Sequence, residues 1–207
     1  MAGRAVSEPS ARKIKDSVAD LYNLTSRWQR LSREGFTIAS RIAKKCISTS
    51  IDANASIEVT TDRSVEEERK EGSRYNLEME EWCQDLTEIV KKLEHVVKKM
   101  ERIVTTLLSI CELEWHQNGR KWRKCPVFLT WHTLRFYLVA RNVLGTYERE
   151  MALRRLIASD LAHVSSRAAA MVLLSSWLYE PHISPHTAFD LQSMLLETGY
   201  QLPTQRQ

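Results

Sequence analysis

The chain has 207 residues, of which 43% are hydrophobic and 27% are charged, and this composition excludes a largely disordered protein. Its formal net charge of +4 is small and divided between both signs, so the composition does not indicate a strongly basic nucleic-acid-binding protein. Only six glycines occur, and no proline stands between Pro9 and Pro126, which favours long helices over a multi-stranded β-fold.

Residues 1–9 are expected to be disordered, and Ser10 is placed to cap a long first helix. The apolar residues of this segment keep helical spacing up to about Cys46: Ile14, Val18, Leu21, Leu24, Trp28, Leu31, Ile38 and Ile42. From 48 to 72 the sequence changes to small and polar residues followed by a charged run. This stretch is predicted to be a flexible connector.

The most regular pattern of the chain begins at Tyr75, in the second predicted helix, which runs from about Ser73 to Leu113. Apolar residues follow in steps of four and three: Tyr75, Met79, Trp82, Leu86, Ile89, Leu93, Val96, Met100, Ile103, Leu107 and Ile110. A second series stands beside the first, with members seven residues apart: Cys83, Val90, Val97, Val104 and Cys111. Two stripes on one helix indicate two partner faces, which favours a bundle over a two-stranded coiled coil.

Residues 10–113 are thus predicted to form a long helical hairpin, and residues 114–132 a basic, aromatic loop. Residues 133–199 are predicted to hold about three further helices, and residues 200–207 a disordered tail. The third helix is expected to pack through one apolar face made of Phe136, Val139, Val143, Tyr147 and Met151. The last member of this face would be either Ile157 or Leu156. The fold class is therefore all-α, a long antiparallel, coiled-coil-like helical hairpin plus a C-terminal group of about three helices forming a bundle.

The fourth predicted helix, residues 167–178, is apolar nearly all round, and such a helix is expected to be central in the fold. Pro181 and Pro185 would end it. A short last helix over 187–198 is followed by Gly199, which is suited to a left-handed C-cap.

No motif of enzymatic chemistry is present in the sequence. The glycines stand apart from one another and form no phosphate-binding loop, so catalysis and a bound cofactor are not expected. His182 and His186 are four residues apart, but Pro185 lies between them and no acidic residue or thiol accompanies them, which argues against a metal site.

The four cysteines form no CxxC pair and are expected to be reduced thiols. No signal peptide or membrane-length apolar run is visible, so an intracellular protein is expected.

The loop after the second helix mixes cations with aromatic rings: Trp115, His116, Arg120, Lys121, Trp122, Arg123 and Lys124. It is interpreted as a solvated basic turn, with direct RNA or DNA contact through Arg120–Lys124 as the alternative. Arg154-Arg155-Leu156 resembles a short cyclin-docking pattern. Because it lies inside a predicted helix, where Leu156 can face the core as easily as a partner, a chance match is the favoured explanation. Ser184-Pro185 matches a minimal phosphorylation pattern, which is very weak evidence.

Several strings, spread in order from residue 10 to residue 199, resemble one family. They are Ser10 to Asp16, Gly35-Phe36-Thr37, Ile110 to Glu114, Trp131 with Thr133, Phe136 and Tyr137, Leu161-Ala162-His163, Trp177-Leu178 with Pro181, and Leu191 to Gly199. Together they resemble the cyclin-dependent kinase 2-interacting protein family. The chain departs from the family at the extreme N-terminus, in the connector and in the basic loop.

This resemblance implies a protein of the nucleus, with the cytoplasm as the alternative location, that has no enzymatic activity and acts in DNA replication, the cell cycle and the DNA-damage response. It further implies binding to a cyclin-dependent kinase, to the kinase that fires replication origins and to a checkpoint kinase partner. It also implies membership of a complex built around AAA-type ATPase subunits, which acts in maturation of the large ribosomal subunit and on replisomes. The resemblance carries no catalytic or binding residue over to this chain.

The leading hypothesis is therefore a helical adaptor for other helical subunits. Its candidate partner-binding residues are Trp82, Leu86, Leu93, Met100, Leu107, Met194 and Leu195. The alternatives are the nucleic-acid binder described above and a self-associating coil. Whether the second face of the heptad helix meets the C-terminal helices or a partner subunit stays open at this point, and the resemblance favours the partner.

Overall fold

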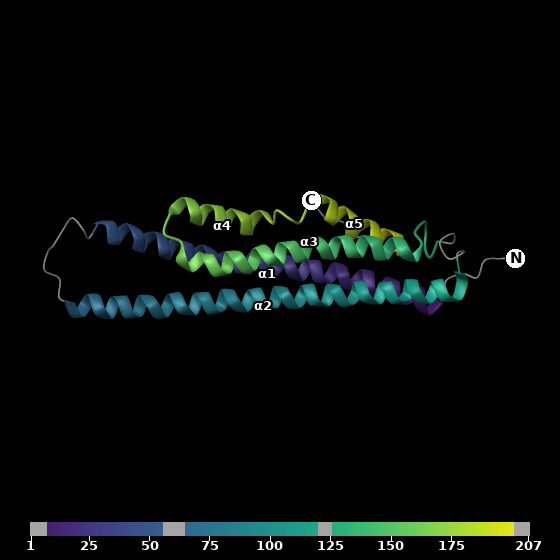
Figure 1. Cartoon of the computed structure of the whole chain (residues 1–207), viewed down its shortest axis with the longest axis horizontal. Coiled ribbons are helices and arrows are strands. Elements are labelled where there is room, and N and C mark those ends of the chain that lie inside the picture. Colours follow the sequence, from purple (N-terminus) through teal and green to yellow (C-terminus); the bar gives the residue numbers. More distant parts are fainter. Residues whose placement is uncertain (1–7, 56–64, 120–125, 201–207) are drawn as a thin grey trace. The chain divides into compact units, whose positions relative to one another are not determined.

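A computed structural model describes residues 8–55, 65–119 and 126–200, and the side chains of 8–48, 77–117, 119 and 126–200. Its helices are α1 (Glu8–Ala55), α2 (Val65–Asn118), α3 (Thr133–Asp160), the short 3-10 helix η2 (Leu161–His163), α4 (Arg167–Tyr179) and α5 (Pro185–Glu197) (Figure 1). These ranges contain no strand, so the predicted all-α class is confirmed. None of the described helices is long and apolar enough to cross a membrane.

The first two helices are longer than their apolar patterns predicted. α1 continues to Ala55 and α2 begins at Val65, so much of the predicted connector at 48–72 is helical. The physical reason is that extending an existing helix forms one hydrogen bond for each residue added, and the Glu, Arg and Lys residues at the start of α2 are good helix formers. α2 likewise runs past Leu113, and Trp115 and His116 belong to its last turns rather than to a loop.

The chain forms two compact units, and these do not follow the predicted division into a hairpin and a C-terminal part. The first unit combines Met1–Trp28, His95–Glu150 and His182–Gln207, and the second combines Gln29–Glu94 and Met151–Pro181. Each unit therefore holds a section of α1, a section of α2 running antiparallel to it, and a section of α3. The fourth helix is α5 in the first unit and α4 in the second.

The core of the first unit is made by apolar side chains from all four of its helices. Its buried members include Ile14, Val18, Leu21, Trp28, Val96, Met100, Val104, Leu107, Phe136, Val139, Val143, Tyr147, Leu191, Met194 and Leu195. Trp28 of α1 and Tyr147 of α3 meet edge to face, with ring centroids 5.2 Å apart. Since Val104 and Cys111 of the second stripe are also buried, both faces of α2 are occupied by the chain's own helices here.

Glu197, at the end of α5, holds the start of α3 in place. Its carboxylate accepts hydrogen bonds from the backbone N–H groups of Thr130, at 2.9 Å, and Trp131, at 3.1 Å, and from the Thr130 hydroxyl. Burial acts to raise the pKa of Glu197, but these hydrogen bonds outweigh it and the pKa is lowered. Gly199 then adopts a φ of +77°, which confirms the predicted left-handed C-cap.

The second unit has a smaller core around α1 and α2, closed by the end of α3 and by α4. Its buried members include Leu31, Ala39, Ile42, Ala43, Cys46, Leu86, Ile89, Val90, Leu93, Met151, Ile157, Leu161, Ala170 and Trp177. Ile157 is buried and Leu156 is exposed, which settles the choice between the two for the inner face of α3. Cys46, Cys83 and Cys111 are free thiols, as predicted, and Cys125 lies outside the described residues.

Gly35 is a point of close approach between α1 and α4. A Cβ atom at this position would lie 2.5 Å from Cζ2 of Trp177 and 3.0 Å from Cγ2 of Ile89. Because Trp177 is a rigid, fully buried ring, it cannot move aside as a flexible side chain would. Glycine at 35 is therefore a packing requirement of the second unit.

We predict that Gly35→Ala destabilises the protein by about 1–3 kcal/mol, because it overpacks a filled site. Urea denaturation followed by circular dichroism measures the change. The control is Gly145→Ala in the interior of α3, where the nearest atom to a new Cβ is the end of the Arg149 side chain, at 3.6 Å. There the higher helix propensity of alanine should stabilise by about 0.5–1 kcal/mol. Equal effects of the two substitutions would contradict the close approach at Gly35.

Glu114 is a buried carboxyl group on α2 in the first unit, and its Oε1 has no hydrogen-bond partner among the described residues. Burial raises its pKa, and the nearby Thr133 hydroxyl offsets this only in part. A pKa raised by folding means that stability is full below the unfolded-state value and falls as the pH rises towards the folded-state value.

We therefore predict that Glu114→Gln raises Tm relative to the unmodified protein at pH 7, and that this gain shrinks as the pH is lowered towards 4. Thermal unfolding across this pH range measures it. The same substitution at the exposed neighbour Glu112 serves as the control and should change Tm little at any pH. A gain for Glu114→Gln that is independent of pH would contradict the argument.

Candidate interaction surface

The structure buries six of the seven side chains that sequence reasoning selected as candidate partner contacts. Leu86 and Leu93 lie in the core of the second unit, and Trp82 is half-buried there. The remaining four lie in the core of the first unit: Met100, Leu107, Met194 and Leu195. A partner could reach the six buried side chains only if the units opened, so these six support the fold rather than form an accessible surface.

The alternative nucleic-acid site falls largely outside the part of the chain that the structure describes. Arg120, Lys121, Trp122, Arg123 and Lys124 all belong to the undescribed segment 120–125. Trp115 and His116, at the end of α2, are exposed. Nucleic-acid contact by this segment stays a prediction.

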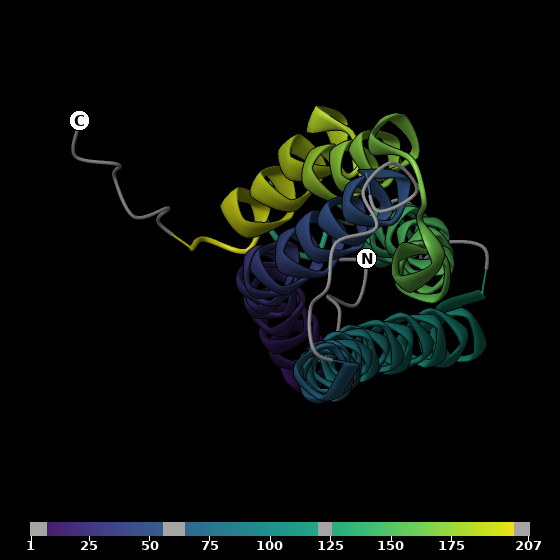
Figure 2. The same ribbon diagram turned by 90° about the vertical axis from the view of Figure 1, so that its left-hand side faces the viewer.

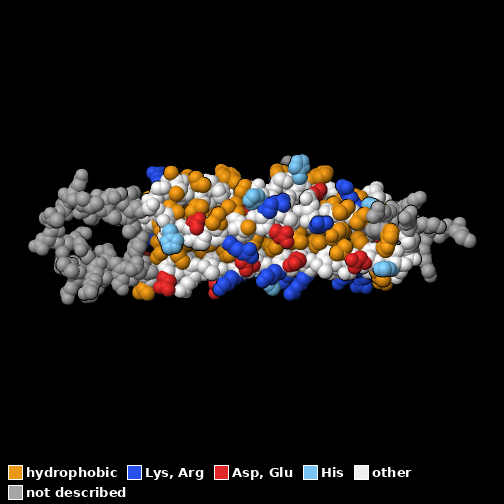
Figure 3. Space-filling view, viewed as in Figure 1, with side chains coloured by type: hydrophobic (Ala, Val, Ile, Leu, Met, Phe, Trp, Pro, Cys, Tyr) orange, Lys and Arg blue, Asp and Glu red, His pale blue; other side chains and the backbone are white. Residues whose placement is uncertain are grey.

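Most of the exposed large apolar side chains that the structure describes in the second unit lie on α4. Met171 is 55% exposed, Val172 63%, Leu178 52% and Tyr179 77%. Met171 and Leu178 are seven residues apart, as are Val172 and Tyr179, so the four form two adjacent columns on one side of the helix, which we call the α4 outer face. Hydrophobic side chains gather over α4 in the space-filling view (Figure 3).

The expectation that α4 is central was wrong, and its place in the unit gives the reason. α4 packs against α1 and α3 on the side away from α2 (Figure 2), and no other described helix of the second unit covers its outer side. Only Ala170 and Trp177 are buried, with Leu173 and Leu174 half-buried between them. The stripe of α4 that contains Ala170 and Trp177 thus faces the core of the second unit, and the other apolar residues of this helix face outward.

Trp177 is the side chain that anchors α4 to α1. It is fully buried, its indole N–H donates a hydrogen bond to the backbone carbonyl of Ser32 at 2.9 Å, and its ring edge lies against Gly35. A buried indole needs a partner for its N–H group, and here the partner is a carbonyl of the facing helix. The rotation of α4 about its axis is therefore defined by a specific contact.

Arg154 of α3 completes this anchor from the other side of the ring. Its guanidinium is fully buried and stacks on the Trp177 ring, with the guanidinium carbon 4.3 Å from the ring centroid. Nη2 donates hydrogen bonds to the Ser32 hydroxyl at 3.0 Å and to Oε1 of Glu180 at 2.8 Å. The Ser32 hydroxyl in turn donates to the same Glu180 oxygen at 2.8 Å.

Glu180 ends α4 in an unusual backbone conformation. It is the C-cap of the helix and has a φ of +46°, in the left-handed region that residues other than glycine seldom adopt. The ion pair with Arg154 and the hydrogen bond from Ser32 hold it there. The same contacts that orient α4 therefore also end it, next to Tyr179 on the outer face.

The cyclin-docking pattern at Arg154-Arg155-Leu156 lies within α3. Its first arginine is buried in the contacts described above, and Arg155 pairs with Glu94 through Nε and Oε1, 2.6 Å apart. Only Leu156 presents an apolar group outward. A docking peptide needs all its key side chains accessible, so the structure supports chance as the origin of this pattern.

The described residues contain no group of three or more His, Cys, Asp or Glu side chains that could hold a metal ion. Sequence reasoning missed the outer face because α4 carries almost no polar residue to mark its outward side. The seven-residue spacing from Ala170 to Trp177 was the available signal for the inward stripe.

No family model matches the sequence. Several known proteins are similar to the chain over nearly their whole length. The chain is 37% identical over 197 residues to a cyclin-dependent kinase 2-interacting protein from Mus musculus and to one from Homo sapiens, covering 95% of this chain and 93% of each relative. A relative of the same name from Xenopus laevis is 35% identical over 199 residues, covering 92% of this chain and 90% of the relative.

Identity of 37% over 95% of the chain confirms the resemblance that the short strings had indicated. The match includes the segments that build the Trp177 anchor, since 95% of the chain is covered. The chain belongs to the cyclin-dependent kinase 2-interacting protein family.

Proposed function

We propose that this protein is a non-enzymatic helical adaptor that binds a cyclin-dependent kinase, and that the α4 outer face is the contact surface. The relatives' name supports the kind of partner. The observation that carries the choice of surface is the exposure of Met171, Val172, Leu178 and Tyr179 on a helix whose inner stripe is firmly anchored. Contiguous exposed apolar side chains rimmed by polar residues are typical of protein interaction sites.

The composition of this face suits a protein partner. Burying a side chain such as Met, Val or Leu contributes about 1.5–3 kcal/mol, so covering the three aliphatic members favours association by several kcal/mol before the costs of binding. Tyr179 adds a rigid ring with a hydroxyl group, a combination enriched among the residues that dominate binding energy. Because Trp177 and Arg154 already fix α4, little ordering is required on binding.

We further propose the roles that the family resemblance implies: a nuclear location and action in DNA replication and DNA-damage signalling. The same resemblance supports membership of an AAA-type ATPase complex in large ribosomal subunit maturation and on replisomes, and contact with an origin-firing kinase. Family membership is the support for these finer roles. The charged and apolar surfaces of the two units are the places where several partners would bind.

We predict that the double substitution Val172→Asp and Tyr179→Asp weakens binding of a purified cyclin-dependent kinase by about tenfold or more. Two carboxylates on the outer face would have to be desolvated against an apolar partner surface. Surface plasmon resonance with the immobilised full chain measures Kd. Circular dichroism should show unchanged helix content, since both positions are exposed.

The matched control places the same charges on another exposed apolar pair, Phe189 and Leu196 of α5. Phe189→Asp with Leu196→Asp should leave kinase binding unchanged. Equal loss in both double variants would show that the α4 outer face is not the specific site. Absence of kinase binding by the unmodified protein would overturn the kinase assignment itself.

The proposed complex is tested by affinity purification from cells, followed by mass spectrometry. We expect AAA-type ATPase subunits to co-purify with the unmodified chain from nuclear extracts. The α4 double variant should lose kinase peptides in the same experiment. If no ATPase subunit is enriched over a tag-only control, the proposed complex membership is wrong.

A further inference from the structure

A groove runs between α1 and α2 in the first unit, separate from the α4 outer face. Its volume is about 410 Å³, and it is lined by four residues of α1 and three of α2: Asp20, Asn23, Leu24, Arg27, Lys99, Arg102 and Ile103. These residues take no part in the contacts of Trp177 or in the α4 outer face. The groove lies where the two antiparallel helices face each other at the surface of their unit.

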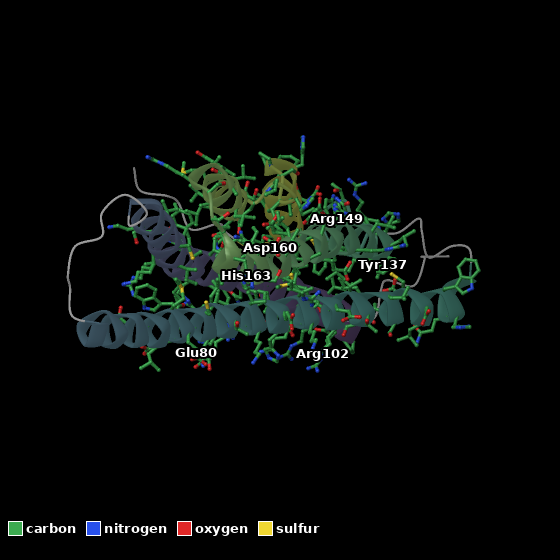
Figure 4. The ribbon with its side chains drawn as sticks, turned by 60° about the vertical axis from the view of Figure 1, so that its left-hand side comes forward. Glu80, Arg102, Tyr137, Arg149, Asp160 and His163 are labelled. Atoms are coloured by element: carbon green, nitrogen blue, oxygen red, sulfur yellow. The ribbon has the colours of Figure 1, made fainter. Side chains whose placement is uncertain are left out.

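The walls and the floor of this groove differ in chemistry. Leu24 and Ile103 are half-buried and form an apolar floor, one from each helix. Asp20, Asn23, Arg27 and Arg102 are exposed and form the rim. Arg102 projects outward from α2 in Figure 4.

The charges of the groove are unbalanced. Three cations, Arg27, Lys99 and Arg102, stand against one carboxylate, Asp20. None of the three cations forms an ion pair with a described residue, whereas Lys92 and Arg155, also on exposed helix surfaces, are each paired with a glutamate. The groove therefore presents cationic groups whose hydrogen-bonding capacity is available to an anionic ligand.

We propose that this groove binds an acidic peptide segment of a partner protein, with an apolar side chain of the segment on the Leu24 and Ile103 floor. Carboxylates of the segment pair with Arg27, Lys99 and Arg102. This is a second interaction surface, and it does not depend on the kinase or on the α4 outer face.

Two features favour a peptide over nucleic acid as the occupant. The apolar floor matches a Leu or Ile side chain, whereas a phosphate backbone offers nothing to cover it. The Asp20 carboxylate on the rim would repel closely spaced phosphates, whereas a peptide can place a neutral residue opposite it. A helix or extended segment that lies between two helices, with charged residues on its flanks, is a known mode of peptide recognition.

The test is fluorescence anisotropy with the full chain and a short fluorescein-labelled peptide built of Glu-Glu-Leu repeats. We expect saturable binding that weakens as salt is added, because exposed ion pairs are screened. A peptide of Lys-Lys-Leu repeats should not bind. A labelled single-stranded oligonucleotide that binds in place of the acidic peptide would overturn the proposal in favour of nucleic acid, and absence of binding to the acidic peptide would also overturn it.

The triple variant Arg27→Glu, Lys99→Glu and Arg102→Glu should weaken peptide binding by about tenfold or more. The control makes the same change of net charge at three other exposed cations of the first unit, with Lys13→Glu, Arg141→Glu and Arg149→Glu. This control should keep binding within about twofold of the unmodified protein. Equal loss in both triple variants would mean attraction by net charge alone and would overturn the groove assignment.

Asp20→Arg gives a test that a folding defect cannot imitate. It replaces the one carboxylate of the groove by a fourth cation and should tighten binding of the Glu-Glu-Leu peptide by about threefold or more. An unfolded protein would not gain a salt-sensitive, saturable site. Weaker or unchanged binding by a folded Asp20→Arg variant would count against the groove as the binding site.

Discussion

The contact of Trp177 with α1 is the constraint on which the surface of the second unit depends. Gly35 leaves the space for the indole ring, the Ser32 carbonyl accepts its N–H, and the Arg154 guanidinium covers its face. A ring held on three sides in this way admits one rotation of α4 about its axis. That rotation decides which apolar residues of α4 are buried and which are left for a partner.

Burial of the Arg154 guanidinium opposes folding, since removing its charge from water costs several kcal/mol. The Glu180 carboxylate and the Ser32 hydroxyl return part of this cost through hydrogen bonds. An apolar side chain at 154 would pack against the ring with less desolvation, but it would remove the ion pair that helps to hold Glu180 at the left-handed end of α4. Such polar contacts define a single geometry where apolar packing alone would allow several.

The regular heptad pattern of α2 suggested a surface for a partner, but the structure gives this helix a different role. The buried residues of its stripes pack within the chain, mainly against α1 and α3, so they give stability rather than recognition, and half-buried members such as Ile103 are the ones that reach a surface. Recognition is left to surfaces that the packing does not consume. One is apolar and lies on α4, and the other is cationic with an apolar floor and lies between α1 and α2. The two proposed surfaces differ in chemistry, so they suit two unlike partners.

The sequence by itself determined the all-α class, the helical spacing along α1 and α2, the left-handed cap at Gly199 and the family. Each of these follows from local physics or from an ordered set of residues: periodicity reports a buried stripe, and glycine reports a positive φ. Only the tertiary structure decided that α4 is peripheral, that Leu156 points outward while Ile157 is buried, and that Arg154 is a buried charge. A periodic pattern reveals a helix face only when polar residues mark the opposite side, and α4 lacks them. The groove was equally hidden, because Arg27 and Arg102 are far apart in the sequence and come together only when α1 and α2 pack against each other.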